Sequence, residues 1–224
     1  FLASIKNLAE ELGIFTSHWW PAYEKAYEAQ KNFNTDILML GIRALEFCET
    51  EGITPIVVLG RPYTIYNKVL NSNVPAILRE QGTLPIPIDC YPVDEEVPIF
   101  DDMYWGYSQR NLRAVHQIRR TSDIYSLWCS NYSCGPDSFN LHFYGYQMEG
   151  KPFAVIETDG HSGDAGTKTR VEAFLHCVRE DLEAKASTKE PNSLKELESR
   201  SKNTTEILRD KDIVLFPRMG QDAE

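Results

Sequence analysis

The sequence predicts an α/β fold: a mostly parallel sheet with helices on both faces, preceded by N-terminal helices. Short apolar, β-branched segments recur along the chain and alternate with segments of helical periodicity, a pattern typical of βαβ units. Right-handed crossovers then bring the carboxyl ends of the strands to one edge of the sheet. The expected strands span residues 55–60, 84–89, 124–129, 152–157 and 213–216, and the expected helices between them span 75–81, 104–120, 138–148 and 167–182.

The first two strands differ in character. Residues 55–60 (Pro-Ile-Val-Val-Leu-Gly) are wholly apolar, which favours a strand buried on both faces of a parallel sheet. Residues 84–89 carry two prolines, which cannot donate ladder hydrogen bonds, so this strand is expected at a sheet edge.

Four regions follow from the pattern. Residues 1–52 form a helical segment packed on the core, in which 17–51 are helical, Asn32-Phe33-Asn34 is a candidate break and Gly52 is the stop signal. Residues 53–182 form the α/β domain. Residues 183–211 are polar and predict a helical linker, with a disordered spacer as the alternative. Residues 212–224 read as the first strand of a truncated following lobe, and a start at Phe1 instead of Met also suggests a cut from a longer protein.

Composition excludes several functional classes. The net charge is −10 and the pI is about 5.1, which argues against sequence-independent binding of nucleic acid. No apolar run approaches the ~18–20 residues that span a bilayer, and no signal-peptide pattern is present, so a cytoplasmic protein without membrane contact is expected. Reduced thiols are more consistent with this setting than disulfides for the five cysteines, Cys48, Cys90, Cys129, Cys134 and Cys177.

The first strand leads into Gly60-Arg61-Pro62-Tyr63. Gly60 permits a sharp turn, and the forked cation of Arg61 suits a carboxylate or phosphate at the edge where open α/β sheets bind ligands. Arg61 could equally pair with a nearby carboxylate and fix the loop.

A cysteine-containing loop follows the third expected strand. Residues 130–139 read Ser-Asn-Tyr-Ser-Cys-Gly-Pro-Asp-Ser-Phe, and Pro136 suits the first turn of a helix. Cys134 would then lie near the N-cap, where unpaired N–H groups and the helix dipole favour a thiolate that binds metal or attacks an electrophile. A buried thiol in a tight turn is the alternative.

The third loop, at 157–170, is rich in glycine, hydroxyl and acidic residues and contains His161. Glycines let backbone N–H groups converge on an anion, while short polar side chains cap the next helix. The spacing matches neither a Walker A loop nor a dinucleotide fingerprint, and no zinc-ligand pair is present. A purely structural loop remains the alternative.

Four segments taken together resemble the 2-hydroxyacyl-CoA dehydratase and benzoyl-CoA reductase superfamily. They are Gly-Arg-Pro-Tyr at 60–63, Met-Tyr-Trp-Gly-Tyr at 103–107, the segment at 130–139 and Glu-Thr-Asp-Gly-His-Ser-Gly-Asp-Ala-Gly at 157–166. The likeness is to the dehydratase-like part of large fused CoA-substrate-specific enzyme activase proteins. It covers about residues 17–182.

The resemblance implies that the sheet is Rossmann-like or flavodoxin-like. It also implies a component of an ATP-coupled, iron–sulfur reductive system that acts on CoA thioesters. Its expected partners are an ATPase activator module and a second dehydratase-like lobe. Cys134 would be one ligand of a [4Fe-4S] cluster that forms only in the full-length protein, so this fragment would hold no cluster and be inactive. The alternative is a non-catalytic module that binds an anion such as CoA or a nucleotide, or docks a partner domain. No catalytic residue is assigned. The candidate ligand-binding residues are Arg61, Tyr63, Asn131, Asp137, Asp159, His161, Ser162 and Arg170.

Overall fold

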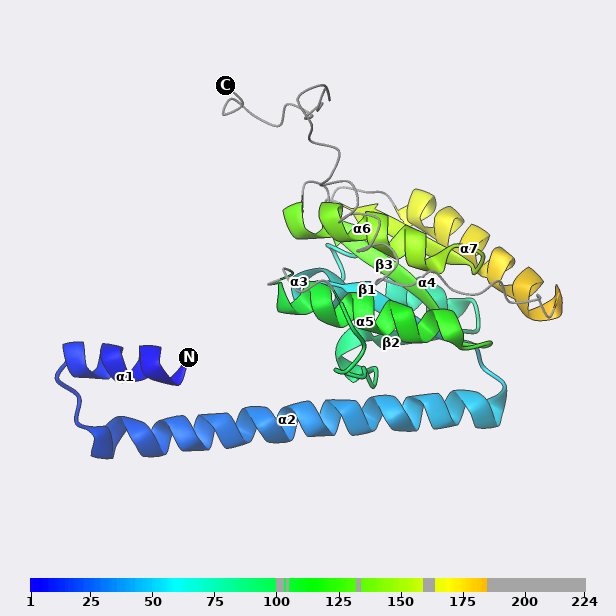
Figure 1. The fold of residues 1–224 in the computed structure, drawn as a ribbon. Helices are drawn as coiled ribbons and strands as arrows, with labels where there is room; N and C mark the ends of the chain where they lie inside the picture. Colours follow the sequence, from blue (N-terminus) through cyan, green and yellow to red (C-terminus); the bar gives the residue numbers. More distant parts are fainter. Residues whose placement is uncertain (100–102, 104, 132–133, 159–163, 185–224) are drawn as a thin grey trace, which may run out of the picture.

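The computed structural model describes residues 1–184 apart from 100–102, 104, 132–133 and 159–163. Within that part the fold is the predicted α/β architecture (Figure 1). The expected strand at 213–216, the following lobe at 212–224 and nearly all of the linker at 183–211 lie outside the described residues.

The sheet has four parallel strands in the order β2-β1-β3-β4. They are β1 (Pro55–Gly60), β2 (Leu84–Pro87), β3 (Tyr125–Asn131) and β4 (Phe153–Thr158). The Pro-containing strand β2 lies at an edge, as its sequence predicts. Strand order reverses between β1 and β3, and such a switch point is where open α/β sheets bind their ligands.

Helices cover both faces of this sheet. Helices α5 (Gly106–Arg120) and α6 (Gly135–Met148) pack together on one face, and α4 (Val74–Glu80) and α7 (Asp164–Ala184) contact each other on the opposite face (Figure 1). The short α3 (Pro62–Ile65) follows β1, and one 3-10 turn, η1 (Ile88–Cys90), follows β2. Both central strands are therefore shielded from water.

The core lies between the sheet and its helices. Val57 and Leu59 of β1 and Leu127 and Trp128 of β3 are completely buried. Each such side chain contributes about 1.5–3 kcal/mol through its removal from water. The core thus holds the carboxyl ends of β1 and β3 in a fixed relative position.

The N-terminus forms α1 (Leu2–Glu11) and α2 (Thr16–Glu51). The candidate break at 32–34 is wrong, since α2 is one helix of 36 residues. Asparagine costs a helix only a few tenths of a kcal/mol, and Gln30 Nε2 donates a hydrogen bond to Asn34 Oδ1 (2.8 Å) one turn later. Gly52 ends the helix with φ +66°, confirming the predicted stop signal.

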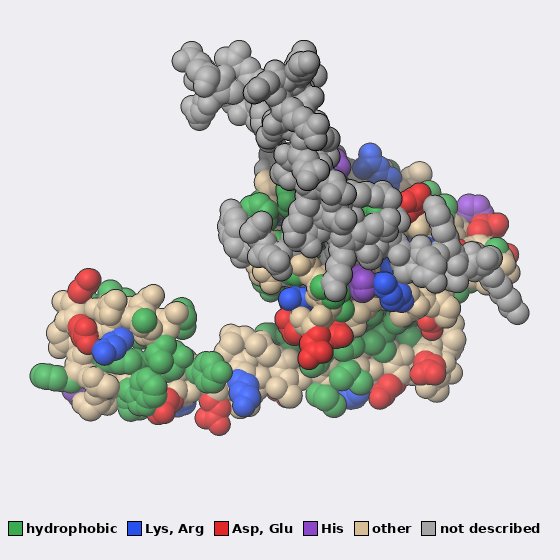
Figure 2. Space-filling view, viewed as in Figure 1, with side chains coloured by type: hydrophobic (Ala, Val, Ile, Leu, Met, Phe, Trp, Pro, Cys, Tyr) green, Lys and Arg blue, Asp and Glu red, His purple; other side chains and the backbone are tan. Residues whose placement is uncertain are grey.

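Helix α2 joins two unlike parts of the molecule. Its C-terminal half lies along the α/β body, whereas its N-terminal half and α1 project beyond it; we call α1 and residues 16–36 the arm (Figures 1 and 2). Contact with the body depends on Gly41, because a Cβ there would lie 1.7 Å from the backbone oxygen of Cys90. Despite its length, neither α2 nor another helix of the described part is apolar enough to cross a membrane.

Candidate functional site

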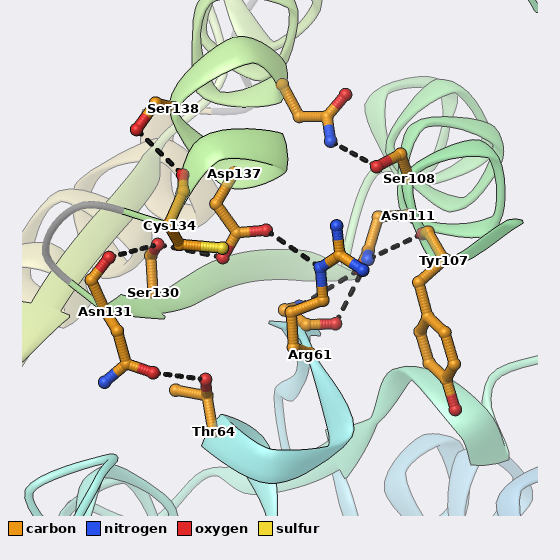
Figure 3. Close-up of polar contacts among 12 residues, drawn as sticks. Arg61, Thr64, Tyr107, Ser108, Asn111, Ser130, Asn131, Cys134, Asp137 and Ser138 are labelled. Carbon is orange, nitrogen blue, oxygen red and sulfur yellow. Dashed lines mark hydrogen bonds and ion pairs between the residues drawn. The ribbon is translucent and has the colours of Figure 1, made fainter. Parts of the chain in front are cut away.

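The turn after β1 is anchored by an asparagine from α5. Asn111 is buried, and its Oδ1 accepts from the backbone N–H of Gly60 while its Nδ2 donates to the backbone oxygen of Gly60 (both 3.1 Å; Figure 3). Gly60 has φ +135°, and a Cβ there would lie 2.3 Å from the backbone oxygen of Cys129. A glycine is therefore required where β1 passes β3. This fixes the direction in which the chain enters Arg61.

Arg61 is paired with a buried carboxylate. Its Nε donates to Asp137 Oδ1 (3.4 Å), and Ser130 Oγ donates to Asp137 Oδ2 (2.8 Å). Asp137 is on the first turn of α6 and is 1% exposed, so the ion pair links β1, β3 and α6 in a partly dry environment. The loop-fixing interpretation of Arg61 therefore has a specific partner. Arg61 Nη2 is also buried and has no hydrogen-bond partner among the described residues.

A second bridge lies beside this pair. Thr64 Oγ1 donates to Asn131 Oδ1 (2.9 Å), and Asn131 Nδ2 donates to the backbone oxygen of Thr158 (3.0 Å) at the end of β4. Thr158 Oγ1 in turn donates to the backbone oxygen of Leu70. One asparagine thus connects the ends of three parallel strands through their loops, and these two contacts fix the orientation of its side-chain amide.

Cys134 is the N-cap of α6, with Pro136 in the first turn, as the sequence predicts. Its thiol is half-buried, and Tyr63 donates its hydroxyl hydrogen to Cys134 Sγ (3.4 Å). Burial, together with the neighbouring Cys134 sulfur and Asp137, raises the pKa of Tyr63 to about 12 against the opposing effect of Arg61. Tyr63 therefore stays a hydrogen-bond donor to this sulfur at neutral pH.

The structure brings several of the predicted residues together at one edge of the sheet (Figure 3). Figure 3 shows Arg61, Asn131, Cys134 and Asp137, and Tyr63 joins them through its hydrogen bond to Cys134. Arg170 is exposed on α7 and makes no hydrogen bond or ion pair with that group. Asp159, His161 and Ser162 lie outside the described residues.

The described residues do not form a cluster site by themselves. No group of three or more histidine, cysteine or acidic side chains gathers within the part of the chain that the structure describes. Cys129 is completely buried, and burial raises its pKa to about 12; burial likewise raises the pKa of Cys48 and Cys90. Cys177 is exposed on α7, away from the strand ends. Cys90, after β2, and Cys134 are both half-buried near strand ends, but Cys134 is the one at a helix N-terminus, so these residues fit one ligand of a cluster and not a complete set.

A cavity of about 790 Å³ lies beside the Arg61 loop, between the middle of α2 and the start of α5. Three arginines, Arg61, Arg110 and Arg113, contribute to its lining. Arg110 and Arg113 share the exposed carboxylate of Glu95 (4.0 and 3.2 Å), and Arg110 Nε is buried without a partner in the described structure. Sequence reasoning missed Arg110, Arg113 and Asn111. The available signal was the concentration of polar side chains at 108–113, near the start of the helix expected at 104–120.

Comparison with known proteins adds one match. Residues 1–91 match the family model of the CoA enzyme activase uncharacterised domain. The match spans the arm, β1, β2 and the Arg61 loop, and it stops before Cys134. This agrees with the activase part of the resemblance, while the dehydratase-like placement stays a prediction. Neither the curated proteins nor the solved structures contain a match to this chain.

Proposed function

We propose that this chain is part of the dehydratase-like component of an ATP-coupled reductive system acting on CoA thioesters, in which Cys134 supplies one thiolate to a [4Fe-4S] cluster. The observation that carries the proposal is the thiol at the start of α6, at the switch point between β1 and β3 and beside Arg61. The match of residues 1–91 to an activase domain supports the CoA-related setting. The other ligands would come from outside the described residues, and an ATPase activator module would be the electron donor.

Such a cluster supplies low-potential single electrons when it is bound. The residues of this chain have a simpler task, which is to hold and orient the sulfur. The N–H groups of the first turn of α6 and the hydroxyl of Tyr63 both place positive potential near Cys134 Sγ, and such contacts stabilise an anionic sulfur ligand. The Arg61–Asp137 pair fixes the helix start that carries this sulfur.

Anaerobic reconstitution of the full-length protein tests the ligand assignment. We expect Cys134→Ala to lose bound iron and sulfide relative to the wild type. Cys177→Ala, which removes an exposed thiol from α7, is the matched control and should retain both. Equal iron and sulfide contents in the Cys134→Ala and wild-type proteins would refute the assignment.

The cavity favours a second candidate, a non-catalytic module that binds an anion. Arg61 and Arg110 both line this cavity. Each has one guanidinium nitrogen, Arg61 Nη2 and Arg110 Nε, without a hydrogen-bond partner in the described structure. A phosphate could satisfy them bidentately and replace the exposed Glu95. Titration calorimetry with CoA and with ATP should give a heat of binding, and Arg110→Met should abolish it. Arg179→Met, which changes an exposed residue on α7, is the control and should preserve the heat of binding. No heat from either compound would rule out this candidate.

A further inference from the structure

A line of exposed apolar side chains runs along one side of α2. Phe33, Leu40 and Phe47 are 57%, 58% and 50% exposed and are spaced seven residues apart, with the exposed Ala26 seven residues before them. Seven residues make almost two helical turns, so these side chains stand in one row. We call Ala26, Phe33, Leu40 and Phe47 the heptad stripe.

The heptad stripe is not the side of α2 that contacts the body. That side contains Gly41 and Cys48, which are buried, and Gly41 lies against Cys90. Consecutive helical residues are rotated by about 100°, so the stripe is turned by about that angle from the docked side. The described part of this chain therefore leaves the stripe uncovered.

The seven-residue period indicates what covers it. A helix that packs on its own domain needs apolar residues only where it meets that domain, whereas an apolar residue at every seventh position supplies one of the two seam positions per heptad by which helices pack along each other. Ala29 flanks the row about one turn before Phe33 and allows a close approach of the second backbone. The seven-residue spacing of the exposed apolar side chains therefore fits a second helix as the partner.

The stripe is complementary to itself when reversed. Leu40 is its centre, and a two-fold rotation through Leu40 places Phe33 of one chain on Phe47 of the other. The same rotation brings Asp36 to within one position of Arg43 of the second copy, twice by symmetry. Neither Asp36 nor Arg43 makes an ion pair with the described residues. Self-complementarity of shape and charge is the requirement of an isologous dimer.

The available surface is sufficient for such a dimer. Overlap centred on Leu40 pairs residues 29–51, a length of roughly 34 Å. Burying half the circumference of a helix ~10 Å wide over that length covers roughly 500 Å² per copy, about 1,000 Å² in total. Specific interfaces start at about this total area, so the expected dimer belongs to the small, weakly associating class of interfaces.

We infer that α2 pairs antiparallel with α2 of a second copy of this chain through the heptad stripe, with the two-fold axis passing near Leu40. The arms of the two copies then point in opposite directions, and the carboxyl edges of the two sheets remain accessible. The inference is independent of the proposed function, because none of the stripe residues belongs to the candidate site.

Charge reversal is the first test. Sedimentation equilibrium of the protein should show a reversible monomer–dimer equilibrium, which Asp36→Arg or Arg43→Asp weakens about tenfold by placing like charges together. The double variant restores the opposite charges and should recover the wild-type Kd. Circular dichroism of each variant controls for folding. A wild type that is monomeric up to ~100 µM, or a double variant no tighter than the single ones, overturns the inference.

Cross-linking tests the position of the axis. Leu40→Cys and Met39→Cys introduce thiols at neighbouring positions that are similarly exposed (58% and 50%) but point about 100° apart. With Cys177→Ser in both, a short bismaleimide should join the introduced thiols of two Leu40→Cys chains and leave Met39→Cys mostly uncoupled. Equal coupling of the two variants, or none in Leu40→Cys, contradicts the antiparallel pairing.

Discussion

The α/β body and the arm are stabilised in different ways. The body encloses a continuous core of side chains from the sheet and from the helices of both its faces. The arm has almost no interior: α1 buries Ala9, and the residues that α2 buries, Gly41 and Cys48, both lie beyond the arm. Local hydrogen bonding and helix propensity must therefore maintain much of the arm, whereas tertiary packing maintains the body. The same substitution should consequently have different effects in the two regions.

The largest expected effect is that of Leu127→Ala in β3. Leu127 is completely buried, so its truncation should lower the free energy of unfolding by about 2–5 kcal/mol in urea denaturation. Leu8→Ala in α1 removes the same atoms from a side chain that is 56% exposed and should change stability by about 0.5 kcal/mol or less. Equal losses in the two variants would show that the arm has a core of its own.

Asp137→Asn tests whether the candidate site also supports the body. It leaves the mostly buried guanidinium of Arg61 without a charged partner, so we expect a loss of about 1.5–3 kcal/mol in the free energy of unfolding. Ser138→Ala is the control, because that hydroxyl is exposed and bonds only within its own helical turn. A neutral Asp137→Asn would mean that the ion pair serves ligand binding more than folding.

Gly41→Ala tests the junction between the two regions. The added Cβ would collide with the backbone of Cys90, so α2 must shift away from η1 at a cost of about 1–3 kcal/mol. Gly166→Ala adds the same methyl group to α7 in open space and should be neutral or slightly stabilising. Limited proteolysis should cut Gly41→Ala faster near residues 50–54. Unchanged cleavage would indicate that the arm and body are coupled elsewhere.

The smallest expected effect is the pH dependence due to His116 in the body. Burial, and then Arg120, lower its pKa in the folded protein below the usual 6.5. The unfolded chain then binds more protons in the window beneath 6.5, so stability decreases as the pH falls through that window. His116→Gln should flatten this part of the stability profile, and His176→Gln, an exposed change on α7, should not. Thermal unfolding at several pH values between 5 and 7.5 measures this pH dependence of stability in each variant.

The sequence predicted the body better than the arm. The apolar run of β1, the prolines of β2 and the Gly-Pro pair after Cys134 each impose a strong local constraint. All three elements form, although β2 ends at Pro87 and residues 88–90 are a 3-10 turn instead of strand, and α6 begins at Gly135, before the expected start at 138. The juxtaposition of Arg61 and Cys134 followed from parallel topology alone, because strand ends that share an edge bring their loops together. Weak local signals were less informative: Asn32 and Asn34 suggested a break that the helix does not have.

Specific partners could not be predicted from the pattern. Whether Arg61 would bind a ligand or pair with Asp137 depends on a side-chain distance between residues 76 positions apart. The role of Asn111 depends on two hydrogen bonds to Gly60, and no sequence rule distinguishes that asparagine from a solvent-exposed one. The topology of the sheet can be inferred from the periodicity of the sequence, whereas these side-chain contacts depend on how the folded elements pack.

Strand β4 is an open edge strand of the described sheet. Among the described strands it has β3 as its single neighbour, so the amides and carbonyls along its outer side have no ladder partner there. Such an edge is a template on which another strand can be laid, from the same polypeptide or from a different one. Alternate amides of β4 should therefore exchange with deuterium quickly as long as no strand pairs with its outer side. Slow exchange along the whole of β4 would show that another strand is already paired there.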